Sequence, residues 1–138
     1  MSIPVTLADL DGALRQRGPA AYVLTVDERG APHVVHAELH AHGGHLTAAV
    51  GRHTAENARS RPRVSLLYPS RNPADYSLIV DTVAIVDVAD DGPRLLLTPA
   101  RAVLHRPAPA PDPATSPCGS DCVPLLLGSQ ARPSGPGA

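Results

Sequence analysis

The sequence lacks lysine, phenylalanine and tryptophan, and each absence limits what the chain can be. All twelve basic residues are arginine, so a permanent positive charge at any binding site must come from a guanidinium group. Three tyrosines are the only large aromatic residues, so a core must consist mainly of Val, Leu, Ala and Ile. Such a composition suits β-strands.

Long apolar runs and a large excess of one charge are also missing. No run approaches the ~18 apolar residues of a membrane-spanning helix, and the N-terminus does not resemble a signal peptide. The formal net charge of -1 argues against a broad electrostatic surface for nucleic acid. We therefore expect a cytoplasmic protein that binds neither membranes nor nucleic acid, and in the cytosol its two cysteines would be reduced thiols.

A shift in composition divides the chain near Pro107. Of the 16 prolines, eight lie between Pro107 and Pro136. We predict one folded domain over residues 1–106 and a proline-rich C-terminal tail over 107–138. Within that tail, the segment 118–127 contains the apolar run Val123–Leu127 and is a candidate for docking onto the domain.

Hydrophobic periodicity predicts a mainly β protein with two or three short helices. Leu7, Leu10 and Leu14 have helical spacing after a possible Thr6 cap. Six strands are expected, the first three as a meander, and Pro99 within the last strand predicts a bulge or an edge position. The regular spacing of antiparallel strands favours a closed barrel. The expected strands cover residues 20–27, 32–40, 45–50, 64–68, 76–87 and 94–104.

The stretch from Leu46 to Tyr68 joins a strand, a glycine turn, a short helix and a second strand. We expect the helix to begin at Thr54, which is a good N-cap, with Glu56 in the first turn. Arg52 and His53 then lie at the mouth of the helix, beside free backbone N–H groups. The backbone N–H donors, the positive end of the helix dipole and the cation of Arg52 together would suit a phosphate group. A plain helix start with solvated charges is the more common explanation of such a pattern.

Two segments in this strand order resemble the pyridoxamine 5′-phosphate oxidase-like family. They are Gly51-Arg-His-Thr-Ala-Glu-Asn57 and Pro62-Arg-Val-Ser-Leu-Leu67. The family is the FMN-binding split β-barrel, and it includes deazaflavin (F420)-dependent reductases and some haem-utilisation proteins. The resemblance covers roughly residues 7–106 and implies a six-stranded antiparallel split β-barrel.

The resemblance also implies a homodimer with two cofactors at the subunit interface. The strand before Gly51 would lie along the flavin ring, and the turn after it would hold the phosphate. The implied function is that of an FMN-dependent oxidoreductase, which transfers a hydride to or from a small substrate. The alternatives are an F420-dependent reductase and a non-catalytic flavin- or haem-binding module. The implied cofactor-binding residues are Ala49, Val50, Gly51, Arg52, His53, Thr54 and Asn57.

This chain departs from many relatives, which carry a lysine or a second arginine at position 53 or 54. The glycine-rich dinucleotide fingerprint is absent, so NAD(P) bound in the Rossmann manner is not supported. No acid–base residue stands out, which agrees with hydride transfer, and no catalytic residue is predicted.

Three other groups of residues have possible chemistry. Histidines 33, 36, 40, 42 and 45 form a dense run, in which His36 and His40 share a strand face with Glu38. They could bind a metal or serve as an axial ligand of haem. Because the histidines lack zinc-type spacing, we favour a polar, solvent-facing side of a hairpin and predict no metal site. Cys118 and Cys122 could be a redox pair, a metal half-site, a labile disulfide or two unrelated thiols. Asp81, in mid-strand, is expected to form a cross-strand ion pair with Arg101 or Arg63.

Overall fold

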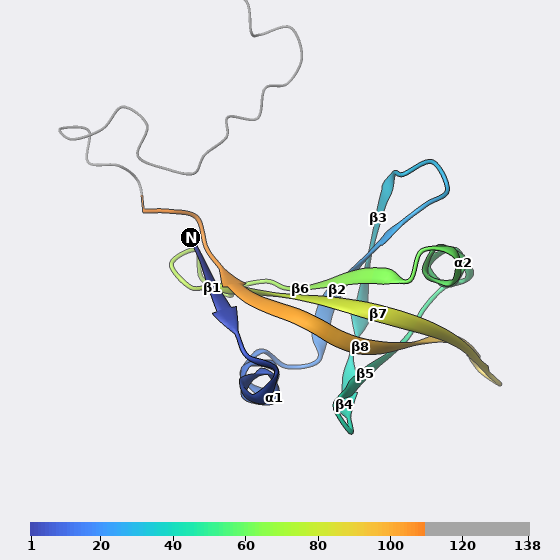
Figure 1. Ribbon diagram of the computed structural model, residues 1–138, viewed down its shortest axis with the longest axis horizontal. Coiled ribbons are helices and arrows are strands. Elements are labelled where there is room, and N and C mark those ends of the chain that lie inside the picture. Colours follow the sequence, from blue (N-terminus) through green and yellow to red (C-terminus); the bar gives the residue numbers. More distant parts are fainter. Residues whose placement is uncertain (110–138) are drawn as a thin grey trace, which may run out of the picture. The chain divides into compact units, whose positions relative to one another are not determined.

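Eight strands and two helices make up the part of the chain that the computed structural model describes, residues 1–109 (Figure 1). Residues Ser2–Arg106 form a single compact unit. Of the predicted tail, segment 118–127 with Cys118 and Cys122 lies outside the described residues. The elements are β1 (Ser2–Val5), α1 (Leu7–Arg17), β2 (Ala20–Val26), β3 (Pro32–Glu38), β4 (His40–His42), β5 (His45–Ala49), α2 (Arg52–Ser60), β6 (Arg63–Tyr68), β7 (Ser77–Ala89) and β8 (Gly92–His105).

The strands form one antiparallel sheet in the order β3-β2-β6-β7-β8-β5-β4, and β1 pairs with the end of β8. The sheet curls, so that β3 and β5 approach each other although neither is the other's partner in the sheet (Figure 1). This curled sheet confirms the predicted mainly β split barrel. It has two strands more than the six expected, because β1 and β4 are too short to produce a recognisable pattern in the sequence.

The predicted meander of the first three strands is wrong. Leu39 is buried and extends the pairing of β3 with β2 by one hydrogen bond, from its backbone N–H to the carbonyl of Pro19 at 2.8 Å. Beyond Leu39 the chain leaves β2 and enters β4. The expected strand 32–40 is therefore divided into β3 and β4. The next strand, β5, pairs with β4 and β8 rather than with β3.

The long hairpin of β7 and β8 contains the irregularity that Pro99 predicts. Asp81 pairs with Arg101 whereas Thr82 pairs with Pro99, so Ala100 is left without a partner as a β-bulge. The expected ion pair is also present, with Asp81 Oδ2 3.4 Å from Arg101 Nη1. Both side chains are largely solvent-exposed, so this pair contributes little to stability.

Helix α1 packs against β8, and cavities separate it from the hairpin of β4 and β5. Its N-cap is Thr6, as predicted: the backbone N–H of Asp9 donates to Thr6 Oγ1 at 3.2 Å. Leu10 and Leu14 are buried, but Leu7 is 56% exposed because it begins the first turn, ahead of the packed face. No helix among residues 1–109 is both long and apolar enough to cross a membrane.

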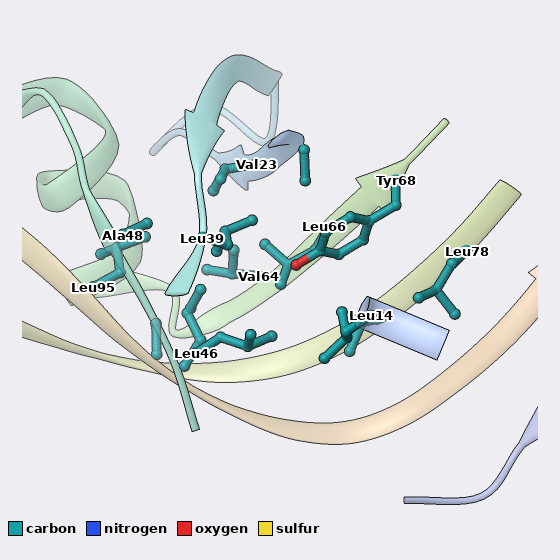
Figure 2. Packing of buried hydrophobic residues seen from close by; sticks show 14 of the residues in the cluster. Leu14, Val23, Leu39, Leu46, Ala48, Val64, Leu66, Tyr68, Leu78 and Leu95 are labelled. Carbon is teal, nitrogen blue, oxygen red and sulfur yellow. The ribbon is translucent and has the colours of Figure 1, made fainter. Parts of the chain in front are cut away.

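Small and branched aliphatic side chains from the inner face of the sheet form the core (Figure 2). Tyr68, at the end of β6, is the largest of the fully buried side chains, in agreement with the lack of Phe and Trp. On the outer face of the same sheet, large apolar side chains stay in contact with solvent. These are Tyr22, Val34, Val83 and Ile85, which are 39–64% exposed.

Candidate functional site

Helix α2 follows strand β5 after Val50 and Gly51, and its N-cap lies three residues earlier than the sequence predicts. Gly51 is the N-cap and has an extended backbone, so the first helical residue is Arg52. The expectation that Thr54 caps the helix is wrong: it lies inside the helix and is 2% exposed. Its side chain belongs to the buried face, together with Ala55, Asn57 and Ala58. Glu56 accordingly falls beyond the first turn.

The first turn of α2 leaves backbone donors without helical partners. The first helical hydrogen bond runs from the Ala55 N–H to the Gly51 carbonyl at 3.1 Å. The N–H groups of Arg52, His53 and Thr54 precede it, and no side chain among the described residues caps this end. These donors and the positive end of the helix dipole favour an anion in front of the turn.

A cavity of about 470 Å³ opens in front of this turn. Six of the seven cofactor-binding residues implied by the sequence contribute to its wall: Ala49, Val50, Gly51, Arg52, His53 and Thr54. The remaining wall comes from β3, which reaches this place because the sheet curls. Within residues 1–109 no carboxylate lines the cavity, whereas Arg52 supplies a fixed positive charge.

The seventh residue, Asn57, points into the protein instead of into the cavity. Its side-chain Nδ2 donates to Thr25 Oγ1 on β2 at 3.1 Å, and both residues are buried. Asn57 thus attaches α2 to the sheet from behind.

Sequence reasoning missed the histidines of β3 as part of this site. His33 and His36 line the cavity, and the ring of His33 lies edge-on to that of His53 with centroids 4.6 Å apart. The His36 ring contacts Tyr22 at 5.3 Å. The run of histidines was visible in the sequence, but its proximity to α2 depends on the curl of the sheet, which no local pattern reveals.

The expected pairing of His36 with His40 on one strand face is wrong. Leu39 divides the strand, so His36 belongs to β3 and pairs with Tyr22, whereas His40 belongs to β4 and pairs with Thr47. Among residues 1–109 no three His, Cys, Asp or Glu side chains are placed to hold a metal ion together. His45 contacts Thr98 at 3.1 Å, away from the cavity.

Comparison with solved structures identifies the fold. A putative pyridoxamine 5′-phosphate oxidase from Listeria innocua superposes with a TM-score of 0.60 at 15% identity, covering 72% of this chain and 98% of that one. The haem storage protein HutZ from Vibrio cholerae gives 0.56 at 19% identity, with coverages of 72% and 94%. An F420 reductase gives 0.54 at 17% identity, with coverages of 62% and 90%. The protein therefore has the split β-barrel fold of pyridoxamine 5′-phosphate oxidase-like proteins.

Sequence comparison gives a nearer relationship. An uncharacterized protein of Mycobacterium bovis is 38% identical, covering 76% of this chain and 84% of that protein. An uncharacterized protein of Mycobacterium tuberculosis matches to the same extent. The chain belongs to the family of these mycobacterial proteins. No protein-family model matches it.

Proposed function

We propose that this protein is an FMN-dependent oxidoreductase that transfers a hydride to or from a small substrate. The observation that carries the proposal is the cavity at the start of α2. Unused backbone donors, the guanidinium group of Arg52 and three histidines converge there, and no carboxylate of residues 1–109 opposes them. The structural neighbours include a putative pyridoxamine 5′-phosphate oxidase and an FAD-binding protein from Mycobacterium smegmatis, which supports a flavin as the ligand.

In this proposal each residue of the turn has a separate task. Arg52 donates two parallel hydrogen bonds to the phosphate, and the N–H groups of the first turn supply further donors. His53 adds a ring N–H, and His33 holds the imidazole of His53 in place through their edge-on contact. Ala49 and Val50, at the end of β5, offer a small apolar surface for the flavin ring. The bound flavin would supply the hydride chemistry, and the protein would orient it.

A haem-binding module without turnover is the second candidate. His33 and His36 favour it, because both line the cavity and imidazole nitrogens are common axial ligands of haem iron. An F420-dependent reductase is the third candidate, since in that case as well the cavity needs only to hold a phosphate.

The proposal also includes a homodimer, because the outer face of the sheet leaves Val83 and Ile85 exposed at 46% and 64%. We place this homodimer in the cytoplasm.

Titration with FMN, F420 and haem tests this assignment. We expect wild type to bind FMN with a flavin spectrum, and Arg52→Ala to weaken that binding by roughly ten- to a hundredfold, the range for a lost hydrogen bond to a charged group. Arg59→Ala is the matched control, because it removes the same charge from the last turn of α2. It should leave the affinity within about twofold, as expected for a charge outside the site.

Each contrary outcome has a definite meaning. A Soret band and no flavin binding would favour the haem-binding module, and selective F420 binding would favour the reductase. If wild type bound none of the three, or if Arg52→Ala bound FMN as tightly as wild type, the phosphate site would be wrongly assigned.

A further inference from the structure

A second cavity lies between α1 and the hairpin of β4 and β5, and it shares no lining residue with the cavity at α2. Its volume is about 430 Å³, which is within the usual size of small-molecule sites. Buried side chains form its apolar wall: Leu14, Leu39, Leu46 and Tyr68. Exposed polar side chains surround its opening: Asp11, Arg15, His40 and His42.

Tyr68 gives this apolar wall one polar group. The residue is 2% exposed, and among residues 1–109 its hydroxyl has no hydrogen-bond partner. The hydroxyl oxygen is not one of the fully buried atoms that lack a partner, so it is accessible from the cavity that Tyr68 lines. Figure 2 shows the ring of Tyr68 extending from β6 over the apolar core. Buried polar groups in proteins nearly always have a partner. A hydroxyl that opens on a cavity from a buried residue, and has no partner among the described residues, is therefore a place for a ligand atom.

The protonation state of Tyr68 limits what that atom can be. Burial raises the pKa of Tyr68 to about 12, so the hydroxyl stays protonated at neutral pH and can donate a hydrogen bond. The matching ligand atom is an acceptor, such as a carbonyl oxygen. The charged side chains are at the opening, and only leucines accompany Tyr68 in the buried wall, so the inner part of the ligand must be uncharged.

We propose that this second cavity binds a small uncharged molecule that has an apolar ring and a carbonyl oxygen, and that the hydroxyl of Tyr68 donates to this oxygen. The leucine wall holds the ring by burying its apolar surface, and the hydroxyl fixes its orientation. The site is independent of the phosphate site at α2, because neither its residues nor its ligand chemistry is shared.

Two probes of nearly equal shape separate the roles of Tyr68 and of the apolar wall. Acetophenone carries a ring and a carbonyl oxygen, and ethylbenzene has the same outline without the acceptor. Binding is followed by the amide shifts of α1, β4 and β5 in two-dimensional NMR of the whole protein. We expect wild type to bind both probes in this cavity. In Tyr68→Phe the dissociation constant for acetophenone should rise roughly two- to tenfold, the range for one neutral hydrogen bond, with that for ethylbenzene unchanged.

Infrared spectroscopy adds a readout that a structural role of Tyr68 would not change. The carbonyl stretch of bound acetophenone should lie at lower frequency in wild type than in Tyr68→Phe. Tyr22→Phe, on the outer face of the sheet, is the control and should behave as wild type. The proposal is overturned if neither probe shifts the cavity amides of wild type. It is also overturned if Tyr68→Phe weakens both probes equally, or leaves both the acetophenone affinity and the carbonyl frequency unchanged.

Discussion

Tyr68 couples the stability of this protein to alkaline pH. Its pKa is about 12 in the folded protein, because burial disfavours the phenolate, against 10.0 for an ordinary tyrosine. For a group whose pKa is raised by folding, the contribution to stability is fully present below the unfolded pKa. We therefore expect the free energy of unfolding to fall as the pH rises from about 10 to about 12. Urea denaturation of wild type and Tyr68→Phe across this range measures the effect.

Tyr68→Phe is the control for wild type in that experiment, since it lacks the titrating hydroxyl but keeps the ring. Its loss of stability between the two pH values should be smaller than that of wild type. Equal losses in the two proteins would show that Tyr68 ionises as easily in the folded chain as in the unfolded one.

Single residues were predicted correctly where local chemistry determines them. Thr6 is a cap because a hydroxyl two or three residues before free N–H groups can reach them, and Asp81 meets Arg101 because strand parity places both on one face. Thr54 was assigned to the same role as Thr6 and is instead buried. Local sequence does not show which of Gly51 and Thr54 the chain uses as the helix start, because that choice depends on how α2 packs on the sheet.

At the scale of elements, the hydrogen bond between Asn57 and Thr25 attaches α2 to β2. Removing either side chain leaves the other buried without a partner, so Asn57→Ala and Thr25→Val should each lower the free energy of unfolding by about 1–3 kcal/mol. The double variant should lose less than the sum, because no unpaired group remains. Urea denaturation of the four proteins forms the double-mutant cycle. Additive losses would mean that the two side chains do not depend on each other.

The elements themselves were largely predictable, and their neighbours in the sheet were not. Alternation of apolar and polar residues predicted the ends of the six longer strands to within a few residues, and Pro99 predicted the position of the bulge. The break in the chain at Leu39 was missed, because apolar and polar residues alternate without interruption across it, from Ala37 to His40. The histidines of β3 were not connected with Arg52, because their proximity depends on the curl of the sheet.

At the scale of the whole molecule, the exposed outer face of the sheet predicts a homodimer. We expect sedimentation velocity at micromolar concentration to give twice the 14.3 kDa mass of the chain. Ile85→Glu, which places a charge on the outer face, should weaken association at least tenfold. Leu7→Glu is the matched control, because Leu7 is 56% exposed on α1 and should leave the dimer intact. A wild-type mass of one chain would contradict the prediction.

The pairing of β1 with β8 constrains the order in which this protein folds during synthesis. Ser2 pairs with His105, so β1 has to wait for the last strand of the unit before it can pair. At about 5–20 residues per second, that delay is on the order of 5–20 s. The hairpin of β7 and β8 needs only neighbouring residues and can form on emergence. A nascent chain that stalls before residue 102 therefore keeps β1 without its partner, and its first strand stays open to chaperones and proteases.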